Sequence, residues 1–254
     1  MINDIIDVIA LIPARIGSTR LPDKPILDIE GKPLIVRTCE TVMKSENITD
    51  IYVATDDYKI KKVCEANDIE VLITSIYPKS GSDRIYEAYT KYNLNAELVL
   101  NVQGDEPLIN HIDIDNMIEN FRQSSADAAT MIKEINNLED LYNPNIVKVV
   151  ISNQNEAIYF SRSPIPFVRD SQKEDFLKKH KFYKHIGIYL YKYSTLDFFV
   201  KAEQSKLELA ENLEQLRLIE NGKKIYCHEI FSESQGVDTL EDLEKVREIF
   251  KNRE

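Results

Sequence analysis

The first half of the chain alternates between short apolar runs and longer amphipathic segments, and this alternation constrains the fold most strongly. The apolar runs predict strands at residues 8–12, 48–54, 69–73 and 97–102. The amphipathic segments predict helices at residues 33–44, 58–66, 82–92 and 111–121. Strands that alternate with helices form βαβ units, which assemble a mostly parallel sheet with right-handed crossovers. The sequence therefore predicts an α/β fold.

The pattern loosens after residue 126. Residues 126–135, 146–160 and 182–191 have β character, and the middle segment is predicted to turn back at residues 153–155 as a hairpin. No linker or internal repeat marks a domain boundary. We therefore expect a single domain over residues 1–254, with a β-rich arm within residues 126–192 that serves as a dimer surface.

The C-terminal part returns to the helical pattern. Residues 207–221 predict one helix that ends at Gly222, with an apolar stripe formed by Leu209, Leu213, Leu216 and Ile219. A last strand is expected at residues 224–229. A closing helix is expected at residues 240–250, with Asp238 or Thr239 as its N-cap.

Composition excludes several classes of partner. The 254 residues are 43% hydrophobic and carry a formal net charge of −11, which disfavours nucleic-acid binding. The three cysteines are widely spaced and show neither a metal-binding nor a disulfide pattern. No apolar run reaches the ~20 residues that a membrane span needs, and the first residues lack a cationic signal region. We therefore expect a cytoplasmic protein without membrane insertion.

A basic loop follows the first predicted strand. Residues 13–25 contain the cations Arg15, Arg20 and Lys24, and the prolines Pro13 and Pro22 exclude a regular helix there. Ligands of open α/β sheets bind beyond the carboxyl ends of strands, and three cations there favour a polyanion such as a nucleoside triphosphate. Neither a Rossmann nor a Walker glycine motif is present. A solvated basic turn is the alternative interpretation.

Two aspartates are candidates for holding a metal ion near that loop. Asp105 follows the strand at residues 97–102, and Gly104 beside it would let the backbone approach a ligand closely. Magnesium is commonly held by one or two carboxylates together with phosphates. Asp238, far along the chain, lies where a strand, a turn and a helix could return it to the same edge. The alternatives are a turn cap for Asp105 and a helix cap for Asp238.

An ordered series of short motifs resembles the 3-deoxy-manno-octulosonate (Kdo) cytidylyltransferases, also called CMP-Kdo synthetases. The series covers nearly the whole chain, and its order makes the resemblance specific. The motifs lie at residues 12–15, 18–25, 31–34, 54–56, 80–84, 101–107, 143–145, 159–162, 185–189, 213–217 and 236–239.

This resemblance implies a fold and an activity. The implied fold is nucleotide-diphospho-sugar transferase-like: a Rossmann-like three-layer α/β/α arrangement with a mixed, mostly parallel sheet and a smaller β-rich dimerisation arm. The implied enzyme is a Mg²⁺-dependent nucleotidyltransferase. It transfers CMP from CTP to the anomeric hydroxyl of Kdo, giving CMP-Kdo and pyrophosphate for lipopolysaccharide biosynthesis. A homodimer is also implied.

The resemblance also assigns residues to roles. The implied catalytic residues are Arg15, Lys24, Asp105 and Asp238, and Asp105 and Asp238 are the implied metal ligands. The implied CTP contacts are Leu11, Pro13, Ala14, Arg15, Arg20, Lys24, Ser80, Gly81, Arg84, Gln103 and Gly104, with residues 80–84 at the base. The implied sugar contacts are Gln103, Arg162, His185, Tyr189, Glu214 and Gln215.

Two departures from the family pattern leave alternatives open. Ser82-Asp83 stands where the family commonly has Thr-Glu, and residues 207–211 lack the proline common before the Glu-Gln pair. An 8-amino variant of Kdo therefore remains an alternative substrate, as does another acidic sugar such as a sialic acid. A catalytically silent nucleotide-sugar-binding protein and an oligomeric scaffold are alternatives of other classes.

Overall fold

The computed structural model describes residues 7–17, 21–232 and 235–252. The chain divides into two compact units. The first contains Met1–Asp115, Leu190–Val200 and Ser232–Glu254, and the second contains Asn116–Tyr189 and Lys201–Phe231. Each unit is therefore built from segments that are distant in sequence.

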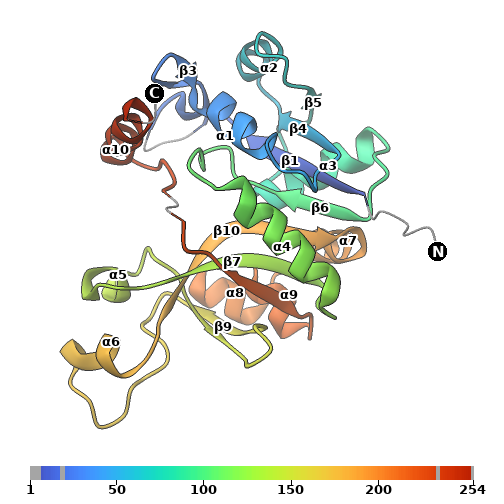
Figure 1. The fold of residues 1–254 in the computed structure, drawn as a ribbon. Coiled ribbons are helices and arrows are strands. Elements are labelled where there is room, and N and C mark those ends of the chain that lie inside the picture. The colour runs from blue at the N-terminus through green and yellow to red at the C-terminus, as the bar shows by residue number, and fades with distance from the viewer. Residues whose placement is uncertain (1–6, 18–20, 233–234, 253–254) are drawn as a thin grey trace. The chain divides into compact units, whose positions relative to one another are not determined.

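Parallel strands form the centre of the first unit (Figure 1). They are β1 (Val8–Ala14), β4 (Asp50–Thr55), β5 (Val71–Ile73) and β6 (Leu98–Asn101). β1 pairs in parallel with both β4 and β6, and β4 pairs in parallel with β5. Every residue of β1 is buried, as its continuous apolar sequence predicts for a strand covered on both faces.

The strand order of this unit creates a ligand-binding position. From β1 the chain proceeds to β4 and β5 on one side, and β6 then pairs with the other side of β1. The loops that leave the carboxyl ends of β1 and β6 therefore lead to opposite sides of the sheet. Open α/β sheets bind their ligands at such a topological switch point.

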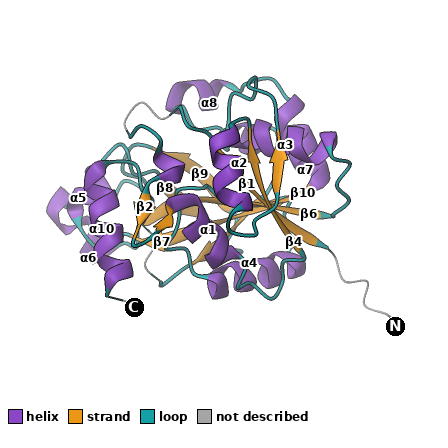
Figure 2. Ribbon diagram, turned by 90° about the horizontal axis from the view of Figure 1, so that it is seen from above, coloured by secondary structure: helices purple, strands orange, loops and turns teal. Residues whose placement is uncertain are grey.

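Helices complete the first unit (Figure 2). Its helices are η1 (Lys24–Ile26), α1 (Leu34–Val42), α2 (Tyr58–Glu65), α3 (Gly81–Lys91) and α10 (Leu240–Lys251), and α7 (Tyr193–Lys201) begins in it. A hairpin of β2 (Asp28–Ile29) and β3 (Lys32–Pro33) contacts α10 and α1. Both α1 and α3 pack against β1. These helices therefore pack against the strand from which one of the two loops described above begins.

The second unit is richer in antiparallel pairing. Its strands are β7 (Ala128–Glu134), β8 (Lys148–Ile151), β9 (Ala157–Ser161), β10 (Tyr183–Lys192, whose last residues belong to the first unit) and β11 (Ile225–Glu229). β7 and β11 are parallel, whereas β8 is antiparallel to both β9 and β10. β8 and β9 form the hairpin predicted around residues 153–155, where Asn155 has a left-handed backbone.

Short helices occupy the connections of the second unit. They are α5 (Leu138–Tyr142), η2 (Lys173–Asp175), α6 (Phe176–Lys179), α8 (Lys206–Glu211) and α9 (Leu216–Glu220); α4 (His111–Gln123) leads into the unit from the first one. A small core of Ile135, Leu141, Phe176 and Phe182 joins α5, α6 and the strand ends.

The single helix predicted over residues 207–221 is wrong. The chain forms α8 and α9 instead, separated at Asn212, whose backbone is left-handed with φ of 52°. A left-handed residue ends an α-helix because it cannot continue the hydrogen-bond ladder. Leu209, assigned to the apolar stripe, is 62% exposed, whereas Leu213 and Leu216 are buried.

The parallel strands with packed helices confirm the α/β class and the mixed, mostly parallel strand pairing. The single-domain organisation and the dimerisation arm at residues 126–192 stay predictions. No helix within the described part of the chain has the length and apolarity that crossing a bilayer requires.

Candidate active site

The loops that leave β1 and β6 line one pocket of the first unit, with a volume of about 370 Å³. Eleven of the predicted site residues line it: Pro13, Ala14, Arg15, Lys24, Ser80, Gly81, Arg84, Gln103, Gly104, Asp105 and Asp238. Leu11 does not line the pocket, because it is fully buried within β1. Arg20 lies outside the described residues.

Lys24 is the point at which the distant parts of this pocket meet. Its Nζ donates to Asp105 Oδ2 and to Asp238 Oδ1, the latter at 3.1 Å. Burial alone would lower the pKa of Lys24, but the carboxylates of Asp105 and Asp238 outweigh it and raise that pKa above 10.5. Lys24 therefore stays a cation and holds together two carboxylates separated by more than a hundred residues.

The backbone also joins the two carboxylate-bearing loops. Val237 N donates to Asp105 O at 2.9 Å. A Cβ on Gly236 would lie 2.8 Å from Glu106 Oε1, so the Glu106 carboxylate lies close against the backbone at residue 236. Thr239, not Asp238, is the N-cap of α10, with a capping box to Asp242. Of the two N-cap candidates the structure selects Thr239, so the Asp238 carboxylate can face Lys24.

Residues 80–84 form a capped helix start at the pocket wall. The Ser80 side chain accepts from Asp83 N, and the Asp83 carboxylate accepts in turn from Ser80 N. Arg84 is 5% exposed; its Nη1 lies 2.7 Å from Asp56 Oδ1 and donates to Thr74 Oγ1. The acidic partner of Arg84 is therefore Asp56.

Asp56 and the Pro78–Lys79 segment are parts of this region that the sequence analysis did not assign. Asp56 follows β4, so the rule that functional groups collect at carboxyl ends of parallel strands could have identified it. Pro78 and Lys79 line the pocket from the loop before α3. No comparable signal marks them, since they lie in an irregular connection.

Gln103 and Gly104 bring β6 close to β1 and α3. A Cβ on Gly104 would lie 2.8 Å from Ile35 Cδ1 and 3.2 Å from Pro13 O. Gly104 also lines the pocket, and its close approach to a ligand stays a prediction. Gly81 sits equally near the Gln103 side chain, with 3.3 Å between its ideal Cβ and Gln103 Nε2.

The other predicted sugar contacts lie in the second unit. Arg162 is held by backbone carbonyls: its Nε donates to Glu211 O, Nη1 to Pro144 O and Nη2 to Asn212 O. His185 and Tyr189 lie on β10, four residues apart and therefore on the same face of the strand. Glu214 is exposed, whereas Gln215 is buried and its Nε2 has no hydrogen-bond partner among the described residues.

The pocket's donor set fits a metal that binds together with a phosphate ligand. Among the described residues no cluster of three or more His, Cys, Asp or Glu side chains could hold an ion alone. Asp105 and Asp238 nevertheless converge on one cation, the Lys24 ammonium. Two hard carboxylates that share a cation position match the way Mg²⁺ is held by carboxylates and phosphates.

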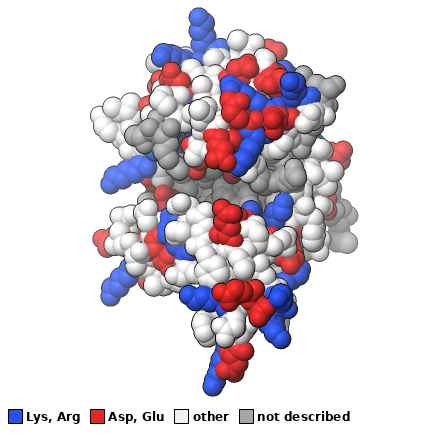
Figure 3. All heavy atoms as spheres, turned by 90° about the vertical axis from the view of Figure 1, so that its left-hand side faces the viewer, with Lys and Arg blue, Asp and Glu red and all other residues white. Residues whose placement is uncertain are grey.

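Charges outside the pocket are mixed. On the face shown in Figure 3, the described Lys and Arg side chains are interspersed with Asp and Glu. This distribution gives the face no broad field of one sign. Within the pocket, Lys24 is paired with Asp105 and Asp238, and Arg84 with Asp56.

Comparison with known proteins gives consistent matches over nearly the full length. The sequence matches the cytidylyltransferase family over residues 9–225. It is 43% identical over 249 residues to the 3-deoxy-manno-octulosonate cytidylyltransferase of Parabacteroides distasonis, covering 96% of this chain and 98% of that one. The enzyme of the same name from Thermodesulfovibrio yellowstonii is 45% identical over 242 residues, covering 93% and 95%.

A solved structure agrees with these relatives. The structure of a CMP:2-keto-3-deoxy-manno-octonic acid synthetase complexed with CTP superposes with a TM-score of 0.90 at 36% identity, covering 98% of this chain and 100% of that one.

Proposed function

Because the chain belongs to the 3-deoxy-manno-octulosonate cytidylyltransferase family, we propose that it transfers CMP from CTP to the anomeric hydroxyl of Kdo. The products are CMP-Kdo and pyrophosphate, and CMP-Kdo serves lipopolysaccharide biosynthesis. The observation that carries the proposal is the contact of Lys24 with Asp105 and Asp238 in a pocket at the switch point of the sheet.

Arg15 and Lys24 bind the triphosphate in this proposal. Arg15 is exposed at the end of β1, and Lys24 reaches the pocket from η1. A guanidinium and an ammonium neutralise the charge that moves onto the leaving pyrophosphate when the α-phosphorus is attacked. The reaction needs positioning and charge neutralisation more than a protein nucleophile.

Asp105 and Asp238 hold Mg²⁺ in this proposal. The bound ion would supply charge neutralisation at the phosphates and lower the pKa of the attacking hydroxyl. In this proposal the two carboxylates would hold the ion, and Lys24 remains a protonated donor for the phosphates because its pKa is raised. The carboxylates are already assembled by Lys24 and by the Val237–Asp105 backbone hydrogen bond.

Base and sugar are assigned to separate groups of residues. Ser80, Gly81 and Arg84 face the base from the start of α3. Gln103, Arg162, His185, Tyr189, Glu214 and Gln215 contact the sugar acid. The unpartnered Nε2 of Gln215 is a donor available to a sugar oxygen. The finer parts of the proposal are Mg²⁺ as the ion, a homodimer, and a cytoplasmic location.

Pyrophosphate release tests this function. The protein is incubated with CTP, UTP, ATP or GTP, with and without Mg²⁺, and with Kdo, 8-amino-Kdo or N-acetylneuraminate as acceptor. We expect release that requires Mg²⁺, CTP and Kdo. Consumption of N-acetylneuraminate alone would refute the Kdo assignment, and the absence of release with any sugar acid would favour a binding protein or a scaffold.

A matched pair of variants tests the metal site. Asp105→Asn removes a proposed ligand charge and should lower turnover about 100-fold, since even groups supporting metal ligands are worth that much. Asp57→Asn makes the same change at the end of the neighbouring β4, where the side chain caps α2 and asparagine caps equally well. The control should keep wild-type turnover, and equal rates for both variants would remove Asp105 from the mechanism.

A further inference from the structure

The hydroxyl of Thr130 on β7 has three polar neighbours in the second unit. Thr130 is fully buried. Its Oγ1 lies 3.0 Å from His185 Nε2, 3.1 Å from Ile186 O and 2.8 Å from Ile188 O. All three neighbours belong to β10, next to β7 in the sheet. One threonine side chain therefore contacts both the backbone and the imidazole of that strand.

The hydrogen-bond donors and acceptors around Thr130 indicate which ring nitrogen of His185 carries the hydrogen. A hydroxyl carries one hydrogen, and a carbonyl oxygen can only accept. If Thr130 donated to Nε2, both carbonyl oxygens would face the hydroxyl oxygen without a hydrogen between them. If Thr130 donates to Ile188 O, the shorter contact, then Nε2 must carry a hydrogen and donate to Oγ1. The second arrangement leaves only Ile186 O facing Oγ1 without a hydrogen, against two carbonyl oxygens in the first, so the hydrogen of the neutral ring is assigned to Nε2.

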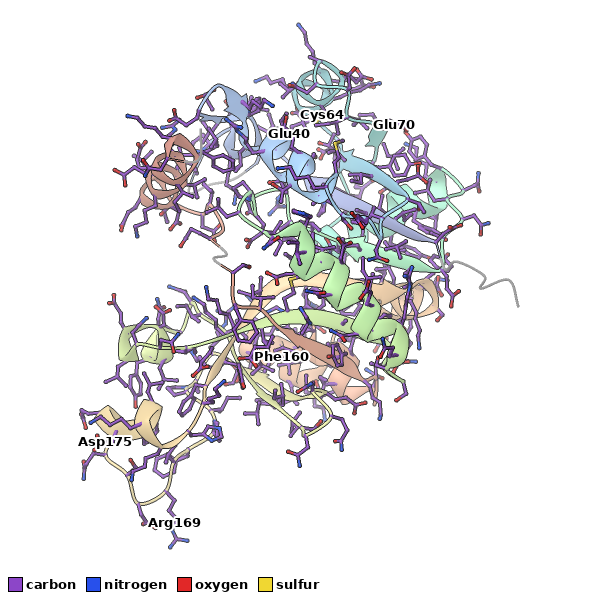
Figure 4. The ribbon with its side chains drawn as sticks, viewed as in Figure 1. Glu40, Cys64, Glu70, Phe160, Arg169 and Asp175 are labelled. Carbon is purple, nitrogen blue, oxygen red and sulfur yellow. The ribbon has the colours of Figure 1, made fainter. Side chains whose placement is uncertain are left out.

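Two aromatic rings fix the orientation of His185. The Phe160 ring on β9, labelled in Figure 4, approaches edge-on with 5.2 Å between centroids, and the Tyr189 ring lies at 5.3 Å. Desolvation by burial lowers the pKa of His185 to about 3. The ring is therefore neutral at physiological pH, and Nδ1 carries a lone pair. Within the described residues Nδ1 has no hydrogen-bond partner, and the side chain keeps some exposure.

We infer that Thr130 is a positioning residue for the sugar substrate: it holds His185 as the Nε2–H tautomer, so that Nδ1 accepts a hydrogen bond from a substrate hydroxyl. This inference rests on the proposed function, because His185 is assigned to the sugar there. An imidazolium would donate at both nitrogens and select the carboxylate of the sugar acid. A neutral ring with a bare Nδ1 selects a hydroxyl, which leaves the carboxylate to other donors.

Substitution of Thr130 separates this role from a packing role. Thr130→Val keeps the shape and removes the hydroxyl, so the ring loses its tautomer constraint. We expect the KM for Kdo to rise about tenfold, the size of one hydrogen bond, with the KM for CTP unchanged. Thr130→Ser keeps the hydroxyl and should restore the KM for Kdo. Thr195→Val is the matched control, because Thr195 is 1% exposed and its hydroxyl has no described hydrogen-bond partner.

The tautomer is measured directly by ¹⁵N NMR of labelled histidine. The chain has four histidines, and the His185→Gln spectrum identifies the His185 signal. We expect the ring hydrogen on Nε2 in the wild-type protein and in Thr130→Ser. A hydrogen on Nδ1 in the wild type overturns the inference, even if Thr130→Val fails to fold. The inference is also overturned if Thr130→Val folds and its KM for Kdo is unchanged. It is overturned as well if Thr130→Val raises the KM values for Kdo and CTP equally.

The same experiments separate this inference from the proposed function. Absence of turnover with every sugar acid would refute the function without changing the tautomer. Normal turnover with the opposite tautomer would refute the inference alone.

Discussion

Lys24 shows how one side chain can assemble a site from remote segments. It is 14% exposed at its side chain, and its ammonium contacts carboxylates that follow β6 and precede α10. Two carboxylates this close would repel each other without a cation. Lys24 therefore stabilises an arrangement of carboxylates that the proposed metal and triphosphate would meet already assembled.

Gly236 tests how firmly the Asp238 loop is held. In Gly236→Ala the new Cβ would lie 2.8 Å from Glu106 Oε1, the far end of a flexible side chain, so the Glu106 carboxylate should swing aside and leave residues 236–238 in place. A displacement of the Asp238 loop by about 1 Å would cost about 100-fold in rate. We therefore expect a much smaller rate loss and unchanged binding of Mn²⁺ in the presence of CTP, measured by electron paramagnetic resonance. The unfolding temperature serves as the control. A large drop in it would mean a folding defect, and a 100-fold rate loss with weaker Mn²⁺ binding would contradict the argument.

The sequence predicted the positions of some pocket residues and not of others. Lys24 and Asp105 were predictable from the residues because each follows a recognisable buried strand. Asp238 was not: its local sequence equally fits a helix cap, and only the fold shows that Thr239 takes that role. Arg84 pairs with the distant Asp56 and not with its sequence neighbour Asp83, because the Asp83 carboxylate takes part in the capping box.

At the scale of elements, α8 and α9 show that the spacing of apolar residues can predict one helix where the chain forms two. The leucine spacing of residues 207–221 fits one helix, yet the chain breaks at Asn212. Two features override the period: Asn tolerates the left-handed backbone, and the Glu208 carboxylate binds Arg217 across the break. Long-range pairing of this kind is invisible to a local pattern. The strands and helices of the first half were predictable because they are buried regularly, and their ends shifted by only a few residues.

The Glu208–Arg217 pair should carry much of the stability of this region. Arg217 Nε donates to Glu208 Oε2 at 2.7 Å and Nη2 donates to Oε1, and the Glu208 side chain is 3% exposed. Glu208→Gln leaves a buried guanidinium without its counter-charge, which should cost about 3 kcal/mol of unfolding free energy at pH 7. Urea denaturation followed by circular dichroism measures the loss.

The Glu208–Arg217 pair also predicts how the unfolding free energy depends on pH. Burial alone would raise the pKa of Glu208, but hydrogen bonds from Arg217, Ser205 and Gln204 lower it below 4.5. A depressed folded-state pKa contributes stability that is present above 4.5 and is lost as the pH falls through the folded value. The difference in unfolding free energy between the wild type and Glu208→Gln should therefore shrink as the pH falls below 4.5.

A double variant tests whether the two side chains are coupled. Glu208→Leu with Arg217→Met should lose less unfolding free energy than the two single changes combined. A loss equal to that sum would exclude a coupled pair.

At the scale of the whole molecule, the proposed substrate residues divide between the two compact units. The pocket with Lys24, Asp105 and Asp238 is lined by first-unit residues, whereas Arg162, His185, Tyr189, Glu214 and Gln215 belong to the second. The alternation of strands and helices predicted the first unit well. The strands of the second unit were also predicted, from their β character, but their mixed pairing and the short helices were not, because these follow from tertiary contacts such as the core around Phe176.

Three buried thiols can report on the two units separately. Cys39 and Cys64, the latter labelled in Figure 4, lie in the first unit, and Cys227 lies in the second. Burial raises the pKa of each thiol, to about 12 for Cys64 and Cys227, so alkylation requires opening of the surrounding structure. If CTP with Mg²⁺ binds the closed first unit as proposed, then at 100 times its dissociation constant it should slow the alkylation of Cys39 and Cys64 about 100-fold. We expect less protection of Cys227, measured by mass spectrometry of alkylated peptides.

Nucleotide without metal is the control for this experiment. Equal protection of all three thiols would contradict the prediction and would show that the two units open as one.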